Sequence, residues 1–257
     1  MGDVISHQPV IDIAHQAGQA IMQIYQRNFD ISTKADTSPL TEADLAAHNV
    51  IVKGLQTISD LPILSEESAN IPWQQRQQWD RYWLVDPLDG TKEFIKKNGE
   101  FTVNIALINQ GQPVWGVVYA PVLQKTYVGD AHSGAYVIDK GSKTDIRVQP
   151  HRDNETWQVV GSRSHQSPEI QDFLNSLPGE TNLVAMGSSL KLCLVAEGVA
   201  HVYPRLGPTS EWDTAAAQAV VEAAGGQVTI HPDGQPLRYN QKESVLNPYF
   251  VVNCKDE

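Results

Sequence analysis

The stretch from Trp83 to Phe94, WLVDPLDGTKEF, contains the residues of this chain that are best suited to chemistry. Four apolar or aromatic residues run into Asp86, so we expect a buried strand that ends there. Asp89 follows three positions later. Pro87 fixes its own φ and favours an extended conformation for the preceding residue, and Gly90 permits a tight reversal. The pattern predicts a short turn that carries two carboxylates.

This turn would also present the Leu88 carbonyl between the two carboxylates, and free backbone N–H groups at Gly90 and Thr91 where a helix begins. Hard cations such as Mg²⁺ prefer carboxylate and carbonyl oxygens together with phosphate oxygens. The alternative is that Asp86 and Asp89 only form a turn and cap a helix.

Three further stretches place acidic residues at the predicted end of a strand or start of a helix. They are Ser65-Glu66-Glu67-Ser68, Glu211-Trp212-Asp213-Thr214-Ala215-Ala216 and Thr41-Glu42-Ala43-Asp44. Each stretch alone is explained by a solvated loop or a helix N-terminus. Together with Asp86 and Asp89 they favour a phosphate site that holds several metal ions.

Other phosphate-handling motifs match less well. Haloacid-dehalogenase-type phosphatases have two aspartates that are two positions apart, Asp-x-Asp-Gly-Thr, whereas Asp86 and Asp89 are three apart. No matching acidic pair follows downstream, since Gly134 stands where a second Asp is needed after Asp130. No Walker A loop is present in the sequence.

In the first half, periodicity predicts two helices followed by strands. The predicted elements are a helix at 10–29; a helix from Thr41, its N-cap, with Leu45, Ala46, Val50, Ile51 and Leu55 inside; a strand at 62–64; a loop or short helix at 71–81; a strand at 82–85; and an antiparallel meander at 101–109, 113–120, 125–128 and 135–138.

The second half alternates strands and helices, which indicates α/β organisation. Strands are predicted at 157–161, 182–185 and 201–203, and helices at 168–176, 188–197 and 211–225. We predict α+β organisation in the first half, α/β in the second, and two domains, 1–147 and 148–257.

Composition narrows the class of partner. The formal net charge is −11, which argues against a nucleic-acid polymer and requires local cations for an anionic substrate. The two cysteines, Cys193 and Cys254, cannot form a disulfide framework, and we expect Cys193 in the core. No secretory signal and no apolar run of about 20 residues is present. We expect a cytoplasmic protein, leaving open peripheral contact with the inner membrane and a monomer or homodimer.

The acidic stretches, in this order, resemble the inositol monophosphatase superfamily. Asp86-Pro87-Leu88-Asp89-Gly90-Thr91 resembles its first signature, and Glu211-Trp212-Asp213-Thr214-Ala215-Ala216, with Gly225-Gly226 after the helix, its second. Ser65-Glu66-Glu67-Ser68 falls where the family has a Glu-Glu pair. The resemblance covers essentially the whole chain and implies the layered αβαβα sugar-phosphatase fold.

The resemblance also implies roles for individual residues. It implies two or three Mg²⁺ ions held by Glu66, Asp86, the carbonyl of Leu88, Asp89 and Asp213. Asp44 and Thr91 would orient an attacking water, and the amides of Gly90 and Thr91 would hold phosphate oxygens. Inhibition by Li⁺ is expected.

Within the superfamily, Lys92-Glu93-Phe94 and the stretch from Asn98 to Asn104 look like the 3′(2′),5′-bisphosphate nucleotidases. Ser188 and Lys191 would bind the second, 5′ phosphate, with Arg205 near that phosphate or the adenine. Lys92, His165 and Asp213 complete the implied substrate contacts.

The sequence therefore predicts a Mg²⁺-dependent phosphatase that removes the 3′-phosphate of adenosine 3′,5′-bisphosphate, with the corresponding phosphosulfate of sulfate assimilation as a further candidate. Inositol-1-phosphate or fructose-1,6-bisphosphate hydrolysis is the alternative on the same metal site. A catalytically silent nucleotide-binding relative is disfavoured, because every implied metal ligand and Thr91 are present.

Overall fold

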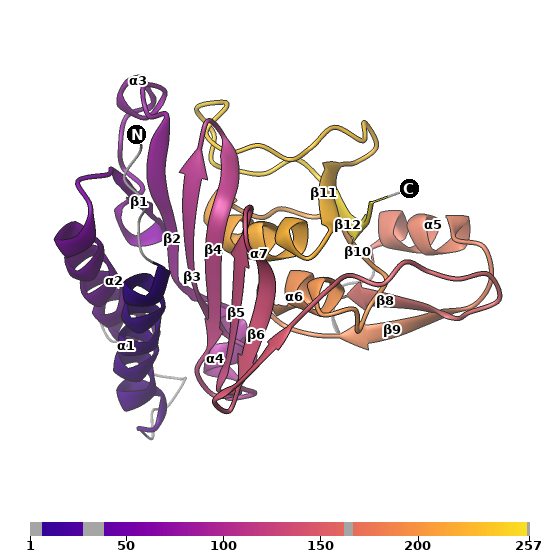
Figure 1. Ribbon diagram of the computed structural model, residues 1–257, viewed down its shortest axis with the longest axis horizontal. Coiled ribbons are helices and arrows are strands. Elements are labelled where there is room, and N and C mark those ends of the chain that lie inside the picture. The colour runs from indigo at the N-terminus through magenta and orange to yellow at the C-terminus, as the bar shows by residue number, and fades with distance from the viewer. Residues whose placement is uncertain (1–6, 28–38, 162–166, 256–257) are drawn as a thin grey trace.

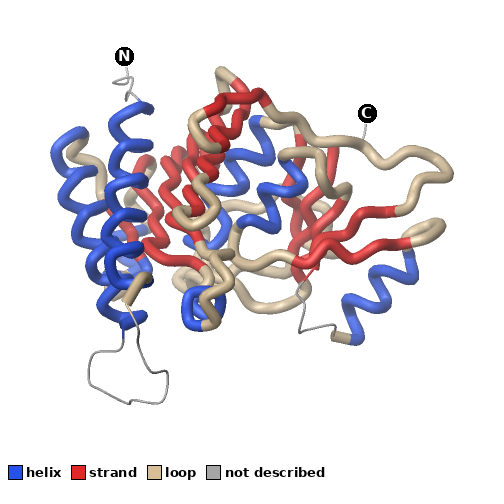
Figure 2. The backbone as a smooth tube through the Cα atoms, turned by 90° about the horizontal axis from the view of Figure 1, so that it is seen from below, coloured by secondary structure: helices blue, strands red, loops and turns tan. Residues whose placement is uncertain are grey.

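The computed structural model describes residues 7–27, 39–161 and 167–255, which form alternating layers of helices and sheets (Figure 1). Helices α1 (His7–Tyr25) and α2 (Pro39–Ile58) cover one face of a first sheet. Helices α7 (Glu211–Ala223) and α6 (Leu190–Ala196) separate this sheet from a second one, and α5 (Pro168–Ser176) lies on the far side of the second sheet. Figure 2 gives the same order from below. The predicted layered αβαβα arrangement is confirmed.

The first sheet has seven strands in sequence order, β1 to β7. Its strands are β1 (Ile63–Ser65), β2 (Arg81–Asp89), β3 (Thr102–Asn109), β4 (Gln112–Ala120), β5 (Lys125–Asp130), β6 (Gly134–Asp139) and β7 (Ser142–Asp145). Strand β1 is parallel to β2, and every other pair is antiparallel. The predicted meander is confirmed, with β7 in addition. Short helices η1 (Glu66–Ser68), α3 (Trp73–Arg76) and α4 (Thr91–Ile95) connect these strands.

The second sheet has the strand order β11-β12-β10-β8-β9. Its strands are β8 (Trp157–Gly161), β9 (Thr181–Ala185), β10 (Val202–Arg205), β11 (Gly226–Ile230) and β12 (Phe250–Cys254). Strands β8, β9 and β10 are parallel, while β12 runs antiparallel to both β10 and β11. The α/β prediction for this half is confirmed, although β11 and β12 lie outside the predicted strands.

Helix α7 packs unusually close to the first sheet because two strand glycines face it. A Cβ atom at Gly116 would lie 2.4 Å from the Ala216 carbonyl oxygen, and one at Gly129 would lie 2.4 Å from the Val220 Cα. The core between the sheets contains residues from both halves of the chain, such as Leu84 and Val220. The chain passes from the first sheet to the second between Asp145 and Trp157; the domain division at residue 147 stays a prediction.

Two local predictions about α2 were wrong. The helix begins at Pro39, so Thr41 lies inside the first turn; proline is favourable at a first helical position, where its missing N–H has no partner to lose. Leu45 is 40% exposed, and Ala43 and Ala47 are buried instead. The inner face is therefore rotated toward smaller side chains, and this rotation buries Asp44.

Candidate active site

Strand β2 does not end at Asp86 as predicted but continues to Asp89. Its register against β3 shifts between these two aspartates, so that Asp86 pairs with Asn104 and Asp89 with Thr102. Strand β1 ends beside Val85, and β2 is then free of a partner on that side. Pro87 is tolerated because it lies at this irregularity, where a missing N–H costs no ladder bond. The two carboxylates are therefore fixed by a sheet rather than by a loop.

Within this irregular segment, a backbone N–H forms a hydrogen bond with the side chain two residues earlier. The N–H of Leu88 donates to Oδ1 of Asp86 at 3.0 Å. Asp86 is 1% exposed, and Asp89 is half-buried. A buried carboxylate needs hydrogen bonds or a cation to offset its desolvation.

Glu66 reaches Asp86 because β1 and β2 are parallel neighbours. Ser65 pairs with Val85, so the next residue of each strand, Glu66 and Asp86, emerges at the same edge of the sheet. Ser65 is buried, and its hydroxyl lies 2.9 Å from Nδ1 of His48 on α2. Burial, followed by the charges of Asp89 and Glu67, raises the pKa of Glu66.

Asp44 approaches the same edge from α2. It is 7% exposed, and burial together with the charges of Glu67 and Glu66 raises its pKa to about 8. The charge of Asp44 also acts on Asp86. Burial, together with the surrounding carboxylates, raises the pKa of Asp86 well above its usual range.

Asp213 joins the cluster from the first turn of α7. Its Oδ2 accepts a hydrogen bond from the Ser210 N–H at 2.9 Å, which closes the helix N-terminus. Burial, then the charges of Asp89 and Glu66, raises the pKa of Asp213 to about 7. Asp213 is thus both a helix cap and a member of the acidic cluster.

The five implied ligand positions, Glu66, Asp86, Leu88, Asp89 and Asp213, come together from η1, β2 and α7. Burial, followed by the charges of neighbouring carboxylates, raises the pKa values of Glu66, Asp86 and Asp213. Within the described residues, no three His, Cys, Asp or Glu side chains have a ready metal-binding geometry. The donor set is nonetheless the oxygen-only set that Mg²⁺ takes, and a divalent cation would relieve this repulsion.

The residues after Asp89 turn sharply away from the sheet. Gly90 has φ 97°, a left-handed conformation that favours glycine, and it precedes α4. Its conformational role in the turn is confirmed. Thr91 and Lys92, in the first turn of α4, are exposed. Their contacts with substrate or water stay predictions.

Two cations lie beside the acidic cluster. Lys191, on α6, is electrostatically close to Asp89 and Asp213; burial lowers its pKa, and Asp89 opposes that shift. Arg205, at the end of β10, acts on both Lys191 and Asp213, and its Nη2 donates to the Pro208 carbonyl at 2.8 Å. The structure therefore brings together cations and acids that are far apart in sequence.

Ser188 is buried and has φ 47°, a strained conformation for a residue other than glycine, immediately before α6. Strain of this kind concentrates at functional sites. Cys193, on α6, is fully buried, as predicted for a core residue. His165 lies outside the described residues.

Sequence reasoning missed Ser189 and Asn104 as site residues. The Ser189 N–H donates to Oδ2 of Asp89 at 2.5 Å, and its hydroxyl donates to Oδ1 of Asn104 at 2.9 Å. A signal for Asn104 was available, because Thr102 and Asn104 are polar residues of β3 that are followed by four apolar ones. Nothing in the sequence indicated which partner they would meet.

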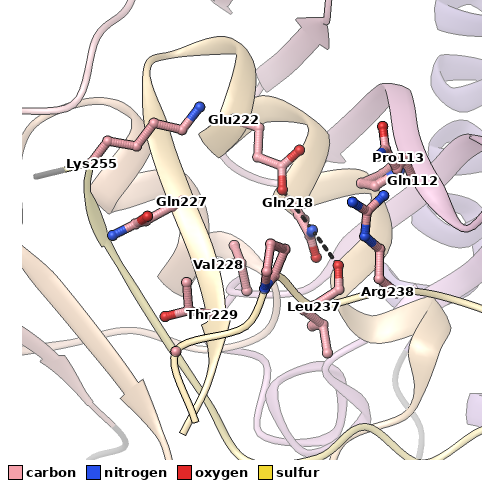
Figure 3. Close-up of a pocket in the computed structure, with 12 residues that line it drawn as sticks. Gln112, Pro113, Gln218, Glu222, Gln227, Val228, Thr229, Leu237, Arg238 and Lys255 are labelled. Carbon is pink, nitrogen blue, oxygen red and sulfur yellow. Dashed lines mark hydrogen bonds between the residues drawn. The ribbon is translucent and has the colours of Figure 1, made fainter. Parts of the chain in front are cut away.

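Two cavities of about 260 Å³ lie away from this cluster. The one in Figure 3 is beside the last turn of α7 and contains Glu222, Arg238 and Lys255. Dashed lines there mark the Gln218 amide, which donates to Glu222 at 2.7 Å and to the Leu237 carbonyl at 3.1 Å. Neither cavity contains a residue of the acidic cluster.

The chain matches a known protein family along nearly its whole length. The model of the inositol monophosphatase family matches residues 7–252. The chain belongs to this family. It is 53% identical over 247 residues to the 3′(2′),5′-bisphosphate nucleotidase CysQ of Escherichia coli (strain K12), covering 95% of this chain and 98% of that protein. It is also 38% identical to CysQ of Aggregatibacter actinomycetemcomitans, covering 97% and 93%.

Solved structures agree with this family membership. The crystal structure of CysQ from Bacteroides thetaiotaomicron has a TM-score of 0.87 and 44% sequence identity, covering 97% of each chain. An inositol monophosphatase from Zymomonas mobilis has a TM-score of 0.76 at 24% identity, covering 96% of this chain and 91% of that one, and supports the fold alone. No described helix is long and apolar enough to cross a bilayer.

Proposed function

We propose that this protein is a Mg²⁺-dependent 3′(2′),5′-bisphosphate nucleotidase, which converts adenosine 3′,5′-bisphosphate to AMP and inorganic phosphate. The observation that carries the proposal is the position of two cations, Lys191 and Arg205, beside the acids Asp89 and Asp213. A substrate with two phosphates needs a cationic subsite close to a metal site. The names of relatives that are 53% identical over 95% of the chain support this substrate. The corresponding phosphosulfate is a second candidate substrate.

The ligand set would be Glu66, Asp86, the Leu88 carbonyl, Asp89 and Asp213, holding two or three Mg²⁺ ions. When bound, the metal lowers the pKa of a coordinated water and offsets the negative charge of the phosphate. The donors fit this role because all are oxygen atoms. Burial and the neighbouring carboxylates disfavour the ionised forms of Glu66, Asp86 and Asp213, and a bound cation would favour them.

The chain's own residues would then orient the reactants. Asp44 and Thr91 approach the cluster from α2 and from the start of α4, and would align the attacking water on phosphorus. The N–H groups of Gly90 and Thr91 would hold oxygens of the 3′-phosphate. Positioning and electrostatic stabilisation account for most of the catalysis of phosphoryl transfer.

The second phosphate distinguishes this substrate from inositol-1-phosphate. Ser188 and Lys191 would bind it, with Arg205 close by, and these groups reverse locally the repulsion expected from a net charge of −11. Lys92 and His165 are further proposed contacts. The relatives' names do not favour the inositol phosphatase or fructose bisphosphatase alternative.

Phosphate release tests this proposal. Adenosine 3′,5′-bisphosphate, inositol-1-phosphate and fructose-1,6-bisphosphate should be compared at equal concentration with Mg²⁺, with and without Li⁺. We expect the nucleotide to react fastest, no reaction in EDTA, and inhibition by Li⁺. Equal or faster release from inositol-1-phosphate would contradict the substrate assignment, and no release from any substrate would favour a catalytically silent relative. The cytoplasmic location and any contact with the inner membrane stay predictions from the sequence.

A further inference from the structure

Ser189 joins the segment that precedes α6 to two polar side chains of β3. Its hydroxyl donates to Oδ1 of Asn104 at 2.9 Å and lies 2.8 Å from Oγ1 of Thr102. Ser189 is 2% exposed, Asn104 1% and Thr102 0%. All three side chains are almost fully buried, and their hydrogen bonds connect them to one another.

The group on which they converge is Asp89. Thr102 is the cross-strand partner of Asp89. Asn104 acts on the Asp89 carboxylate and stabilises its ionised form. The Asn104 Nδ2 is buried and makes no hydrogen bond of ordinary geometry. An unsatisfied buried donor beside a carboxylate is a strong constraint, because leaving it unpaired costs free energy.

The direction of these bonds is set by chemistry. Oδ1 of Asn104 accepts from the Ser189 hydroxyl, so this amide oxygen fixes the orientation of the Ser189 side chain. The Ser189 hydroxyl, having donated its proton, accepts from Thr102. The result is an ordered pair of hydrogen bonds, from Thr102 to Ser189 and from Ser189 to Asn104, that fixes Ser189 beside Asp89.

The backbone of Ser189 adds a second contact with the same carboxylate. Its N–H donates to Oδ2 of Asp89 at 2.5 Å, and a bond to an ionised carboxylate is stronger than one between neutral groups. Ser189 therefore contacts Asp89 through its backbone, while its side chain anchors that backbone to β3. It also lies between Ser188 and Lys191, the residues assigned to the second phosphate.

We propose that Ser189 is a positioning residue for Asp89, which it holds through its own N–H while its hydroxyl anchors that N–H to Asn104 and Thr102 of β3, and that it thereby links the segment binding the second phosphate to the metal site. This inference rests on the proposed function for Asp89 as a metal ligand and for Ser188 and Lys191 as the segment that binds the second phosphate. Groups that orient a metal ligand typically change metal affinity or activity by about 10–100-fold when they are removed.

Direct titration of Mg²⁺ by calorimetry tests the proposal without an activity assay. Ser189→Ala keeps the backbone N–H but removes the hydroxyl, and should weaken Mg²⁺ binding by about 10-fold or more. Thr102→Val, which is isosteric but cannot donate, should weaken it in the same direction, whereas Thr102→Ser, which retains the donor, should stay within about 3-fold of the wild type.

Thr126→Val provides the matched control. Thr126 is 2% exposed, and its hydroxyl lies 2.8 Å from Nε2 of His15, far from the acidic cluster. This variant should lower the melting temperature without changing Mg²⁺ affinity, which separates a general loss of a buried hydrogen bond from a specific effect on Asp89.

Ser189→Ala with wild-type Mg²⁺ affinity would overturn the proposal, and so would equal effects of Thr102→Val and Thr102→Ser. If Ser189→Ala does not fold, the Thr102 pair decides. If the wild type itself binds no Mg²⁺, the proposed metal site fails, and this inference fails with it. If the wild type binds Mg²⁺ and Ser189→Ala binds it with the same affinity, the role of Ser189 is contradicted but the metal site is not.

Discussion

The Asp213 carboxylate accepts a hydrogen bond from the backbone N–H of Ser210 at 2.9 Å, so the residue that caps α7 also faces Asp89 across the site. Helix capping and metal binding are usually alternative explanations for an acidic residue in a first helical turn. In this protein they coexist, because the cap uses one oxygen and leaves the other available. The helix thereby orients a carboxylate that the opposing acids would otherwise repel.

Two substitutions at Asp213 separate these roles. Asp213→Asn removes the charge but retains an oxygen that can accept from Ser210, whereas Asp213→Ala removes both. Both should abolish phosphatase activity. In denaturant unfolding without metal, Ala should be less stable than Asn by about 1 kcal/mol, the usual value of one hydrogen bond. Equal stabilities would mean that the bond to Ser210 contributes nothing to the cap.

Metal-free stability should fall as pH rises from 7 to 9. The pKa of Asp44 is raised to about 8 in the folded state from an ordinary 3.8, so the unfolded chain is already ionised in this window while the folded chain still holds a proton. The stability contributed by that proton is fully present below the unfolded pKa and is lost as pH rises through about 8. We expect a loss of about 1 kcal/mol, or a melting temperature lower by about 2–4 °C.

The control for this prediction is Asp44→Asn, which has no proton to lose and should show a flatter dependence on pH in calorimetric melts. Histidines should contribute little in this window, because the shifts resolved at His7, His15, His48 and His201 are all downward from 6.5. An unchanged slope in Asp44→Asn would show that other groups cause the pH dependence.

Local sequence was sufficient to locate the acids but not to explain how they are held. Asp86, Leu88 and Asp89 are close in sequence, and the strand before them is a short apolar run, so the metal-site hypothesis could be formed from that segment alone. The prediction that β2 ends at Asp86 was wrong because a proline normally ends a strand, and the missing partner beyond Val85 is a property of the sheet.

The contacts that complete the site join segments about a hundred positions apart, and no local pattern encodes them. Lys191 could be assigned only through resemblance to a family, and Ser189 was missed, because their proximity to Asp89 depends on α6 lying between the two sheets. The rotated face of α2 was missed for a related reason. The leucine and alanine residues of α2 allow either of two helix faces to be the buried one. Tertiary packing selects the face that buries Asp44.

Close packing of α7 predicts strong effects of small substitutions at Gly116 and Gly129. Neither has a left-handed backbone, so the obstacle to a side chain is contact with the α7 backbone, 2.4 Å from a new Cβ at each position. Gly116→Ala or Gly129→Ala should destabilise the protein by about 1–3 kcal/mol. Because α7 carries Asp213, Mg²⁺ affinity should fall as well.

Gly207→Ala is the matched control, since a Cβ there has no heavy atom within 4 Å and no left-handed φ is involved. It should leave the free energy of unfolding within about 0.5 kcal/mol of the wild type, as expected for surface substitutions. Destabilisation of Gly207→Ala equal to that of Gly116→Ala in urea titrations would mean that loss of glycine flexibility, rather than contact with α7, is the cause.

Lys191→Met should reduce discrimination between substrates with and without a 5′-phosphate. The ammonium group lies close to Asp89 and 5.9 Å from the centre of the Tyr203 ring, so methionine can occupy the same partly buried space without a charge. Loss of one charged hydrogen bond, about 1.5–3 kcal/mol, should lower kcat/KM for adenosine 3′,5′-bisphosphate by about 10–100-fold. For adenosine 3′-monophosphate, which has no second phosphate, the decrease should be much smaller.

Lys53→Ala, an exposed charge change on α2, controls for the altered net charge and should affect neither substrate. An equal decrease for both nucleotides would instead assign Lys191 to the stability of Asp89, with which it shares the site, and would leave Arg205 and Ser188 as the groups to test for the second phosphate.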